Sequence, residues 1–148
     1  MRREGACPCG AVRFVVDGPV RDVIVCHCKA CLEATGGPWA ASAARRGDLT
    51  VLDPATVLWA QAAVSEHSAS RGRCRTCRTV VFWDAPERTT VSFAAALLED
   101  GGQLDVAAHI WVGEEERRAL GTTGLPVSAE GLPAAVEVAW RGRAPATG

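Results

Sequence analysis

Seven cysteines, gathered into three short clusters, constrain the fold of this 148-residue chain more than any other feature. The clusters are C-x-C, C-H-C-x-x-C and C-x-x-C, at residues 7–9, 26–31 and 74–77. Spacings of this kind place two sulfurs on one tight turn, where both can bind the same metal ion. A chain that brings such turns together must fold so that segments far apart in the sequence meet at the metal.

The cysteines favour metal binding over disulfides because nothing in the sequence indicates export to an oxidising compartment. Arg2 and Arg3 are not followed by an apolar run of signal-peptide length. No stretch approaches the ~18 consecutive apolar residues of a membrane helix. We therefore expect a cytoplasmic protein without a membrane partner, in which thiols stay reduced. An odd number of cysteines also suits metal sites better than a disulfide framework.

Charge and composition predict one globular domain with no nucleic-acid partner. The net charge is −1 and the pI about 6.3, whereas nucleic-acid binders usually carry a basic face. Hydrophobic residues make up 48% and charged residues 22%, which is an ordinary globular mixture. We predict a single domain over residues 1–141 and a flexible Ala/Pro/Gly/Arg-rich tail over residues 142–148. Arg141, at that boundary, is interpreted as a surface charge.

Short β-like runs separated by turn residues predict a mainly β fold of several packed sheets with few short helices. The clearest run spans residues 79–83, and the other predicted strands are 11–16, 22–25, 39–44, 49–52, 57–60, 89–94 and 106–112. Residues 29–35 predict one or two helical turns. Residues 114–120 predict a helix, because acids in the first turn and later arginines suit the helix dipole, and Gly121 ends it. The charged run 114–118 within it is interpreted as a solvated face.

Zinc coordination suggests how the seven cysteines divide. Tetrahedral zinc takes four thiolate or imidazole ligands, so the pairs 7/9 and 74/77 can complete one closed site. Such a site would add about 10–16 kcal/mol of zinc-binding free energy to folding. Cys26, Cys28 and Cys31 would then leave a fourth position for water or substrate, as in catalytic zinc sites. From spacing alone, this trio can instead join either outer pair, and His27 can be a ligand.

Around these cysteines the sequence resembles the glutathione-dependent formaldehyde-activating (GFA) family, also called the CENP-V/GFA domain. The matching segments come in the family's order and cover roughly residues 5 to 126. They are G-A-C-P-C-G-A-V-R-F at 5–14, C-H-C-K-A-C at 26–31, Gly36-Gly37-Pro38-Trp39, Arg71 before the C-x-x-C, and His109-Ile110-Trp111-Val112. The pair of motifs G-x-C-x-C-G-x-V-x-F and C-H-C-x-x-C is rare outside the family.

The resemblance implies a zinc-stabilised multi-sheet β fold, often called a β-tent, with two zinc ions per chain. It implies a structural zinc and a catalytic zinc, whose ligands are respectively Cys7, Cys9, Cys74 and Cys77, and Cys26, Cys28 and Cys31. It also implies glutathione chemistry, since the family's founding activity joins formaldehyde and glutathione into S-hydroxymethylglutathione and its class is carbon–sulfur lyase. The chain departs from the family after Cys77, where Arg78-Thr79 replace the usual Gly-Ser.

Several residues near the cysteines are further candidates. Lys29 and Arg71 can offset the negative charge of a zinc ion bound by several thiolates. His27 is interpreted as a hydrogen-bonding partner that orients a ligand thiolate. Trp39 is a candidate wall of a pocket beside the three-cysteine turn. His109 is either an acid/base or glutathione contact near the open zinc, or a structural histidine bonded to backbone.

Three functions remain open from the sequence. The first is a zinc-dependent carbon–sulfur lyase acting on adducts of glutathione or another small thiol, with Cys26, Cys28, Cys31 and His109 as its catalytic residues. The second is a non-catalytic, zinc-stabilised module that binds a protein partner. The third is a redox or zinc-release switch built on the three thiolates. The intact three-cysteine cluster favours the enzyme.

Overall fold

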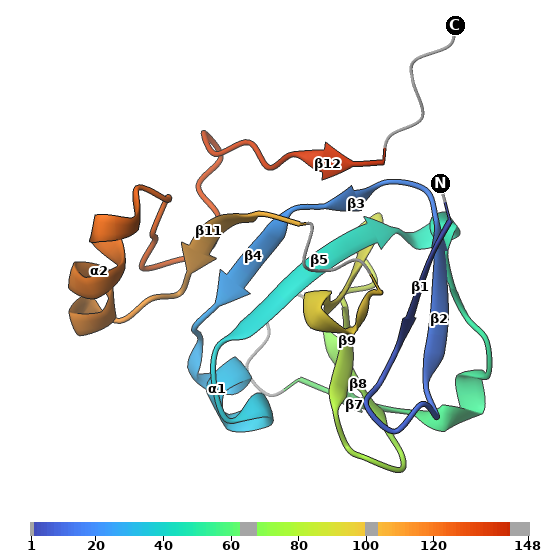
Figure 1. The fold of residues 1–148 in the computed structure, drawn as a ribbon. Coiled ribbons are helices and arrows are strands. Elements are labelled where there is room, and N and C mark those ends of the chain that lie inside the picture. The colour runs from blue at the N-terminus through green and yellow to red at the C-terminus, as the bar shows by residue number, and fades with distance from the viewer. Residues whose placement is uncertain (1, 63–67, 100–103, 143–148) are drawn as a thin grey trace, which may run out of the picture.

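The computed structural model describes residues 2–62, 68–99 and 104–142 and shows a mainly β chain with two short α-helices (Figure 1). The strands of this described part form several mostly antiparallel sheets. The fold class predicted from the sequence is therefore confirmed. Of the predicted tail, only Gly142 lies within the described residues.

The smaller sheet contains β1 (Arg2–Ala6), β2 (Arg13–Asp17) and β6 (Leu49–Val51), in the order β1-β2-β6 and antiparallel throughout. Gly5 in β1 pairs with Phe14 in β2. A Cβ at Gly5 would collide with the Phe14 ring. Glycine therefore lets this ring lie across β1, where it contributes to the core.

The larger sheet runs in the order β11-β4-β5-β10-β9-β8-β7. Its pairs are antiparallel except β11 with β4, which is parallel with Ile110 opposite Cys26. The short strands β3 and β12 pair with each other, and β3 also pairs with β5. The strand bounds are β3 (Val20–Arg21), β4 (Val23–Cys26), β5 (Trp39–Arg45), β7 (Val57–Gln61), β8 (Ser70–Cys74), β9 (Val80–Asp84), β10 (Thr90–Ala94), β11 (Val106–Ile110) and β12 (Trp140–Arg141).

The two α-helices follow the two parallel strands, at the end of the molecule away from the small sheet (Figure 1). Helix α1 (Lys29–Thr35) comes after β4, and α2 (Glu114–Leu120) comes after β11. Glycine ends each helix, and Gly36 does so in the left-handed conformation that glycine adopts without strain. Helix α2 buries none of its residues. Its position must therefore depend on contacts of its polar side chains and on its neighbours in the chain.

The main core lies where the small sheet packs on the large one. Phe14, Phe82 and Phe93 are fully buried, and the Phe14 ring lies 5.3 Å from that of Phe82 and 5.4 Å from that of Phe93. Burying one such side chain contributes about 1.5–3 kcal/mol. Cys7 and Cys74 belong to the same buried cluster. Two of the seven thiols are thus part of the main core.

An ion pair between an exposed arginine and a buried carboxylate attaches the end of the described chain. Asp22, which is 4% exposed, accepts hydrogen bonds of 3.0 and 2.8 Å from Arg141. Arg141 also donates to Asp105 at 3.1 Å. Arg141 is exposed, as interpreted from the sequence, but its guanidinium also satisfies a buried carboxylate.

Each segment predicted as a strand or helix forms that element, with ends shifted by at most two residues. The sequence predicts no strand at β1, β3, β8 or β12. Strands β1 and β8 read Arg-Arg-Glu-Gly-Ala and Ser-Arg-Gly-Arg-Cys, so neither shows the apolar alternation that identifies a half-buried strand. Both form because neighbouring strands satisfy their backbone groups.

Candidate metal centres

The fold gathers all seven cysteine thiols into two groups. Within each group the sulfur atoms lie within 4.8 Å of one another, and all seven thiols are free of disulfides. The four-cysteine group contains Cys7, Cys9, Cys74 and Cys77, and the three-cysteine group contains Cys26, Cys28 and Cys31. Spacing alone left this division open, and the geometry of the structure separates the trio from both outer pairs.

Two hairpin turns supply the four-cysteine group, and Figure 1 shows both at the lower end of their strands. Cys7 and Cys9 lie in the turn between β1 and β2, while Cys74 ends β8 and Cys77 lies in the turn to β9. In each turn the backbone N–H of the first cysteine donates to a carbonyl five residues later, at 3.0 Å in both cases. The two turns, one from each sheet, thus close in the same way and place their sulfurs together.

The four-cysteine group fits a tetrahedral metal ion. Zinc–sulfur bonds of about 2.3 Å in a tetrahedron separate the sulfurs by about 3.8 Å. Here the Sγ of Cys9 lies 3.5 Å from that of Cys7 and 3.6 Å from that of Cys74. The spacing matches bound thiolates and is too long for a disulfide bond.

Hydrogen-bond donors favour the thiolate form of Cys74 and Cys77. The Sγ of Cys74 accepts from the N–H groups of Thr76 and Cys77 at 3.3 and 3.4 Å. The Sγ of Cys7 accepts from the N–H of Val12 at 3.3 Å. The Thr79 hydroxyl, 3.2 Å from the Sγ of Cys77, lowers the pKa of Cys77 to about 6. Donors of this kind stabilise the deprotonated sulfur that a metal requires.

One strand end and one helix start supply the three-cysteine group. Cys26 ends β4, Cys28 is the N-cap of α1, and Cys31 lies in the first turn of that helix. The Sγ of Cys28 accepts the backbone N–H of Cys31 at 3.3 Å, as a capping side chain does. Thr35 donates its hydroxyl to the carbonyl of Cys31 at 2.9 Å. The three sulfurs are therefore positioned by local backbone geometry within six residues.

The surroundings of the trio combine apolar walls with one cation. Cys31 packs in a small cluster with Trp39, Ala41 and Val80, against which Cys26 and Cys28 also pack. The Nη2 of Arg71 lies 3.7 Å from the Sγ of Cys31. Of the two cations predicted to offset the thiolate charge, Arg71 reaches a sulfur, whereas Lys29 is exposed to solvent.

Hydrogen bonding within the trio favours one thiolate even without a metal. The Cys26 thiol donates to Cys31, and together with the Arg71 guanidinium this lowers the pKa of Cys31 to about 6. The same hydrogen bond, together with burial, raises the pKa of Cys26. Cys31 can therefore bind a metal ion as a thiolate, and the metal then displaces the proton that Cys26 shares with it.

Both ring nitrogens of His27 are occupied by side chains that are remote in the sequence. Its Nδ1 lies 2.9 Å from Oε2 of Glu116, and its Nε2 lies 2.9 Å from Nδ1 of His109. His27 is therefore available neither as a ligand nor as a partner that orients a thiolate, contrary to both interpretations of its sequence position. Burial and the neighbouring His27 lower the pKa of His109. Glu116 was interpreted as part of a solvated helix face, and no local sequence signal marks its contact with His27.

A groove of about 360 Å³ is lined by residues that neighbour both cysteine groups, although no cysteine of the trio lines it. Trp39, which is only 9% exposed, lines it and also packs against Cys31, so the tryptophan forms the wall expected from the sequence. Cys77 of the other group lines the groove as well, which places the groove between the two metal centres. The remaining lining residues are Ala34, Thr35, Arg78, Thr79, Val80, Ala94, Ala96 and Leu97.

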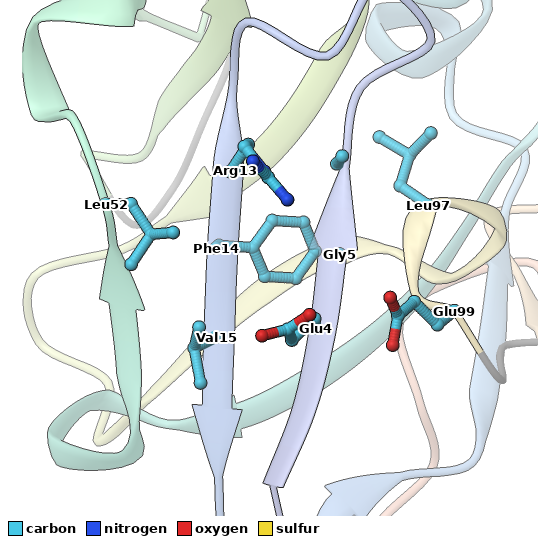
Figure 2. A pocket seen from close by; sticks show the side chains of 9 residues that line it. Glu4, Gly5, Arg13, Phe14, Val15, Leu52, Leu97 and Glu99 are labelled. Atoms are coloured by element: carbon cyan, nitrogen blue, oxygen red, sulfur yellow. The ribbon is translucent and has the colours of Figure 1, made fainter.

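A second cavity of about 150 Å³ lies over β1 and β2 and includes no cysteine (Figure 2). Figure 2 shows the Phe14 ring at its centre, beside Gly5, with Glu4 and Glu99 on one side. Phe14 is fully buried, and its ring fills the space that a side chain at Gly5 would need. No cysteine lines this cavity, so it is not part of either metal centre.

Comparison with known proteins places the chain in a family. Residues 2–114 match the sequence profile described as glutathione-dependent formaldehyde-activating enzyme. A crystal structure of a Rhodobacter sphaeroides protein aligns with a TM-score of 0.55 and 22% sequence identity, covering 84% of this chain and 98% of that one. This similarity concerns the fold. No curated protein matches the sequence significantly.

Within the described residues, no helix has the length and apolar character needed to cross a membrane.

Proposed function

The chain belongs to the glutathione-dependent formaldehyde-activating enzyme family, and on this premise we propose that it is a zinc-dependent carbon–sulfur lyase. Its substrates are adducts of glutathione or another small thiol with an aldehyde, of the S-hydroxymethylglutathione type. The observation that carries the proposal is the three-sulfur group: one turn supplies three metal ligands, apart from a complete group of four. Three protein ligands leave a coordination position for substrate.

The two groups take different roles in this proposal. Cys7, Cys9, Cys74 and Cys77 hold a structural zinc that ties the small sheet to the large one. Cys26, Cys28 and Cys31 hold the catalytic zinc. A zinc ion bound there would lower the pKa of a substrate thiol and polarise a carbonyl.

Arg71 balances the charge of the open site. Three thiolates exceed the two positive charges of zinc, and a substrate thiolate adds a further negative charge. The Arg71 guanidinium, 3.7 Å from the Sγ of Cys31, offsets part of this excess in an apolar environment where charges interact strongly. Its role is therefore to keep a doubly negative site stable when a thiol is bound.

In this proposal the groove lined by Trp39 and Val80 holds the body of the substrate. Trp39 and Val80 give it an apolar wall that is continuous with the packing around Cys31. Arg78 stands at its rim, exposed, and its guanidinium has no partner among the described residues. A carboxylate of a thiol such as glutathione can pair with this guanidinium.

Cobalt substitution tests the proposal without requiring turnover. Co²⁺ replaces zinc in the purified protein, and glutathione is then titrated while the sulfur-to-cobalt absorption is recorded. We expect the absorption to change with added glutathione in the wild type and to stay constant in Cys28→Ser. Arg78→Ala is expected to need about tenfold more glutathione, the loss of one charge-assisted hydrogen bond.

Catalysis is then measured directly. Exchange between ¹³C-formaldehyde, glutathione and their adduct is followed by NMR with and without protein. Faster exchange with the wild type and not with Cys28→Ser is the expected result. Absence of both the spectral change and faster exchange, with any small thiol, would contradict the enzyme and leave the non-catalytic binding module as the better account.

A further inference from the structure

Arg21 in β3 is a partly buried arginine whose guanidinium bonds to backbone carbonyls and not to an acid. Its Nε donates to the carbonyl of Asp22 at 3.2 Å, and its Nη2 donates to that of Ala41 at 3.1 Å. Among the residues that the structure describes, no carboxylate lies within ion-pairing distance of this guanidinium. The side chain is thus held in place by neutral groups that leave its charge unbalanced.

Two other arginines of the protein show the usual solution. Arg46 donates to both carboxylate oxygens of Asp84, at 2.9 and 2.7 Å, and Arg141 donates to both oxygens of Asp22, at 3.0 and 2.8 Å. A guanidinium carries five N–H donors, and the two carbonyl bonds of Arg21 use only two of them. Within the described part of the chain its Nη1 bonds to nothing, so Arg21 can still bind an anion.

The surroundings of Arg21 disfavour its positive charge. Burial lowers the pKa of Arg21 to about 10, and the charge of Arg88 adds to this shift. The Arg88 guanidinium lies 5.3 Å from the centre of the Trp83 ring, and Trp83 packs against the cluster that contains Cys31. A bound anion would offset both the burial and the repulsion between the two arginines.

The strand pattern places Arg21 on the side of the sheet that carries the three-cysteine group. Val20 and its partner Ala44 are fully buried in the main core, so the next residue, Arg21, points to the opposite face. The carbonyl that accepts from its Nη2 belongs to Ala41, which packs with Cys31 in the small cluster. The guanidinium therefore lies next to the residues that surround the trio.

The groove proposed for the substrate reaches the same part of the sheet. Ala94 in β10 lines the groove and pairs with Ala41. Arg78 also lines the groove, from the turn between β8 and β9. Because β3 pairs with β5 and the sheet continues β5-β10-β9-β8, Arg21 and Arg78 come from opposite sides of β10. Two guanidiniums are thus available from two directions.

We propose that Arg21 binds a carboxylate of the substrate, and that Arg21 and Arg78 together select small thiols that carry two carboxylates. This inference rests on the proposed lyase function. Trp39 pairs with Cys26, and Ala41 lies two residues further along β5, which is about 7 Å. That step is longer than the separation of sulfur and carboxylate within one cysteine. Glutathione fits, because its two carboxylates lie on either side of its central cysteine.

The carboxylate site is tested first with a ligand that has no free thiol. S-methylglutathione keeps both carboxylates but cannot form a thiolate, so its binding does not require a sulfur–metal bond. Titration into the zinc-loaded protein, followed by NMR, should show binding by the wild type and about tenfold weaker binding by Arg21→Gln. No binding by the wild type, or equal binding by the two proteins, would overturn the inference.

Changes on the ligand distinguish a direct contact from general structural damage. In the two monoamides of S-methylglutathione, one carboxylate or the other is replaced by a neutral amide. The wild type should bind either amide about tenfold more weakly than the parent ligand. Arg21→Gln should bind one amide as well as the parent, and Arg78→Ala should do so with the other. Weaker binding of both amides by Arg21→Gln would overturn the contact with Arg21.

Two further variants control for folding and for loss of an arginine. Arg21→Lys keeps the charge but binds a carboxylate as a point charge, so we expect about threefold weaker binding of S-methylglutathione. If Arg21→Gln does not fold, unchanged affinity in Arg21→Lys would overturn the inference. Arg75→Gln is the matched control, because Arg75 also donates to a carbonyl, that of Ala55. This variant should bind as the wild type does, and an equal loss would overturn a specific role of Arg21.

Failure of the proposed function gives a different result. If S-methylglutathione binds through Arg21 but glutathione changes neither the cobalt absorption nor the formaldehyde exchange, the lyase is overturned and the carboxylate site stands. In an active enzyme, Arg21→Gln should raise KM for glutathione about tenfold, as loss of a charge-assisted contact does. Turnover by the wild type with an unchanged KM in Arg21→Gln would overturn the selection of dicarboxylic thiols and leave the lyase standing.

Discussion

The two cysteine groups use the same ligand atoms in different surroundings. The group of four joins two hairpin turns from different sheets, and two of its members, Cys7 and Cys74, are part of the main aromatic core. The group of three comes from a single turn and packs in a small separate cluster. A metal in the first would hold distant parts of the chain together, whereas a metal in the second would hold only six residues. The surroundings thus predict one structural and one reactive centre.

Removal of one cysteine from each group should separate the two roles most clearly. Cys74→Ser removes a ligand that also lies in the core, and the lost zinc-binding free energy, about 10–16 kcal/mol, is as large as the ~5–15 kcal/mol stability of many domains. We expect this variant to be unfolded by circular dichroism. Cys28→Ser should stay folded and keep one zinc ion. The reverse outcome would mean that the roles are exchanged.

Chelation should release the two metals in a fixed order. The trio comes from one six-residue segment, whereas Cys7 and Cys74 of the other group belong to the main core, so local opening releases the metal of the trio first. With a colorimetric chelator we expect two phases, the second about tenfold slower than the first, with loss of circular dichroism in the second phase alone. Cys28→Ser should show only the slow phase. A single phase, with structure lost in proportion, would contradict the separation of the two centres.

Arg73 forms hydrogen bonds near both cysteine groups. Its removal therefore tests whether the two metal centres are independent of each other. Its guanidinium donates to the carbonyl of Ala34 in α1 at 3.1 Å and to that of Arg78, beside the four-cysteine group, at 3.3 Å. Arg73→Ala removes both bonds, each worth about 1.5–3 kcal/mol when the donor is charged. We expect zinc affinity at the trio to fall about tenfold with the other site unchanged, measured by competition with a chelator.

Arg75→Ala is the matched control for that substitution. Arg75 follows Cys74 and donates to the carbonyl of Ala55, away from the trio. Its replacement should leave the zinc affinity of the trio unchanged. Equal losses in the two variants would indicate a general effect of arginine removal and would contradict a specific link through Arg73.

Arg78 gives a smaller test of the four-cysteine turn. Its φ is 65°, in the left-handed region that glycine adopts freely and arginine does not. Arg78→Gly should raise the free energy of unfolding by about 1 kcal/mol through relief of this strain. Denaturant unfolding of the zinc-loaded protein measures the change. A lower stability would mean that the arginine side chain contributes more than its backbone conformation costs.

The smallest expected effect is a pH dependence of stability that comes from His109. Burial, with a contribution from His27, lowers the pKa of His109 from 6.5. The unfolded chain therefore binds a proton at a higher pH than the folded one. The unfolding free energy should fall as pH drops below 6.5 and stop falling below the folded-state pKa. His109→Gln should reduce this loss between pH 7.5 and 5.5, and an equal pH dependence in both proteins would contradict the shift.

The sequence predicts the apolar strands and both helices, because periodicity and turn residues are local signals. It does not predict β1 and β8, which lack apolar alternation and form because neighbouring strands pair with them. These two strands lead directly to Cys7 and Cys74, so the four-cysteine group depends on pairings that the local pattern conceals. Cysteine spacing indicated the trio as a unit, but the contact between His27 and Glu116 joins residues 89 positions apart and has no local signature.

The zinc content of the chain, purified without chelators, tests the central claim most directly. Mass spectrometry under native conditions counts the metal ions in each molecule. The account predicts two zinc ions in the wild type and one in Cys28→Ser. A single zinc ion in the wild type, unchanged by Cys28→Ser, would contradict the claim that the three-cysteine group is a second metal centre.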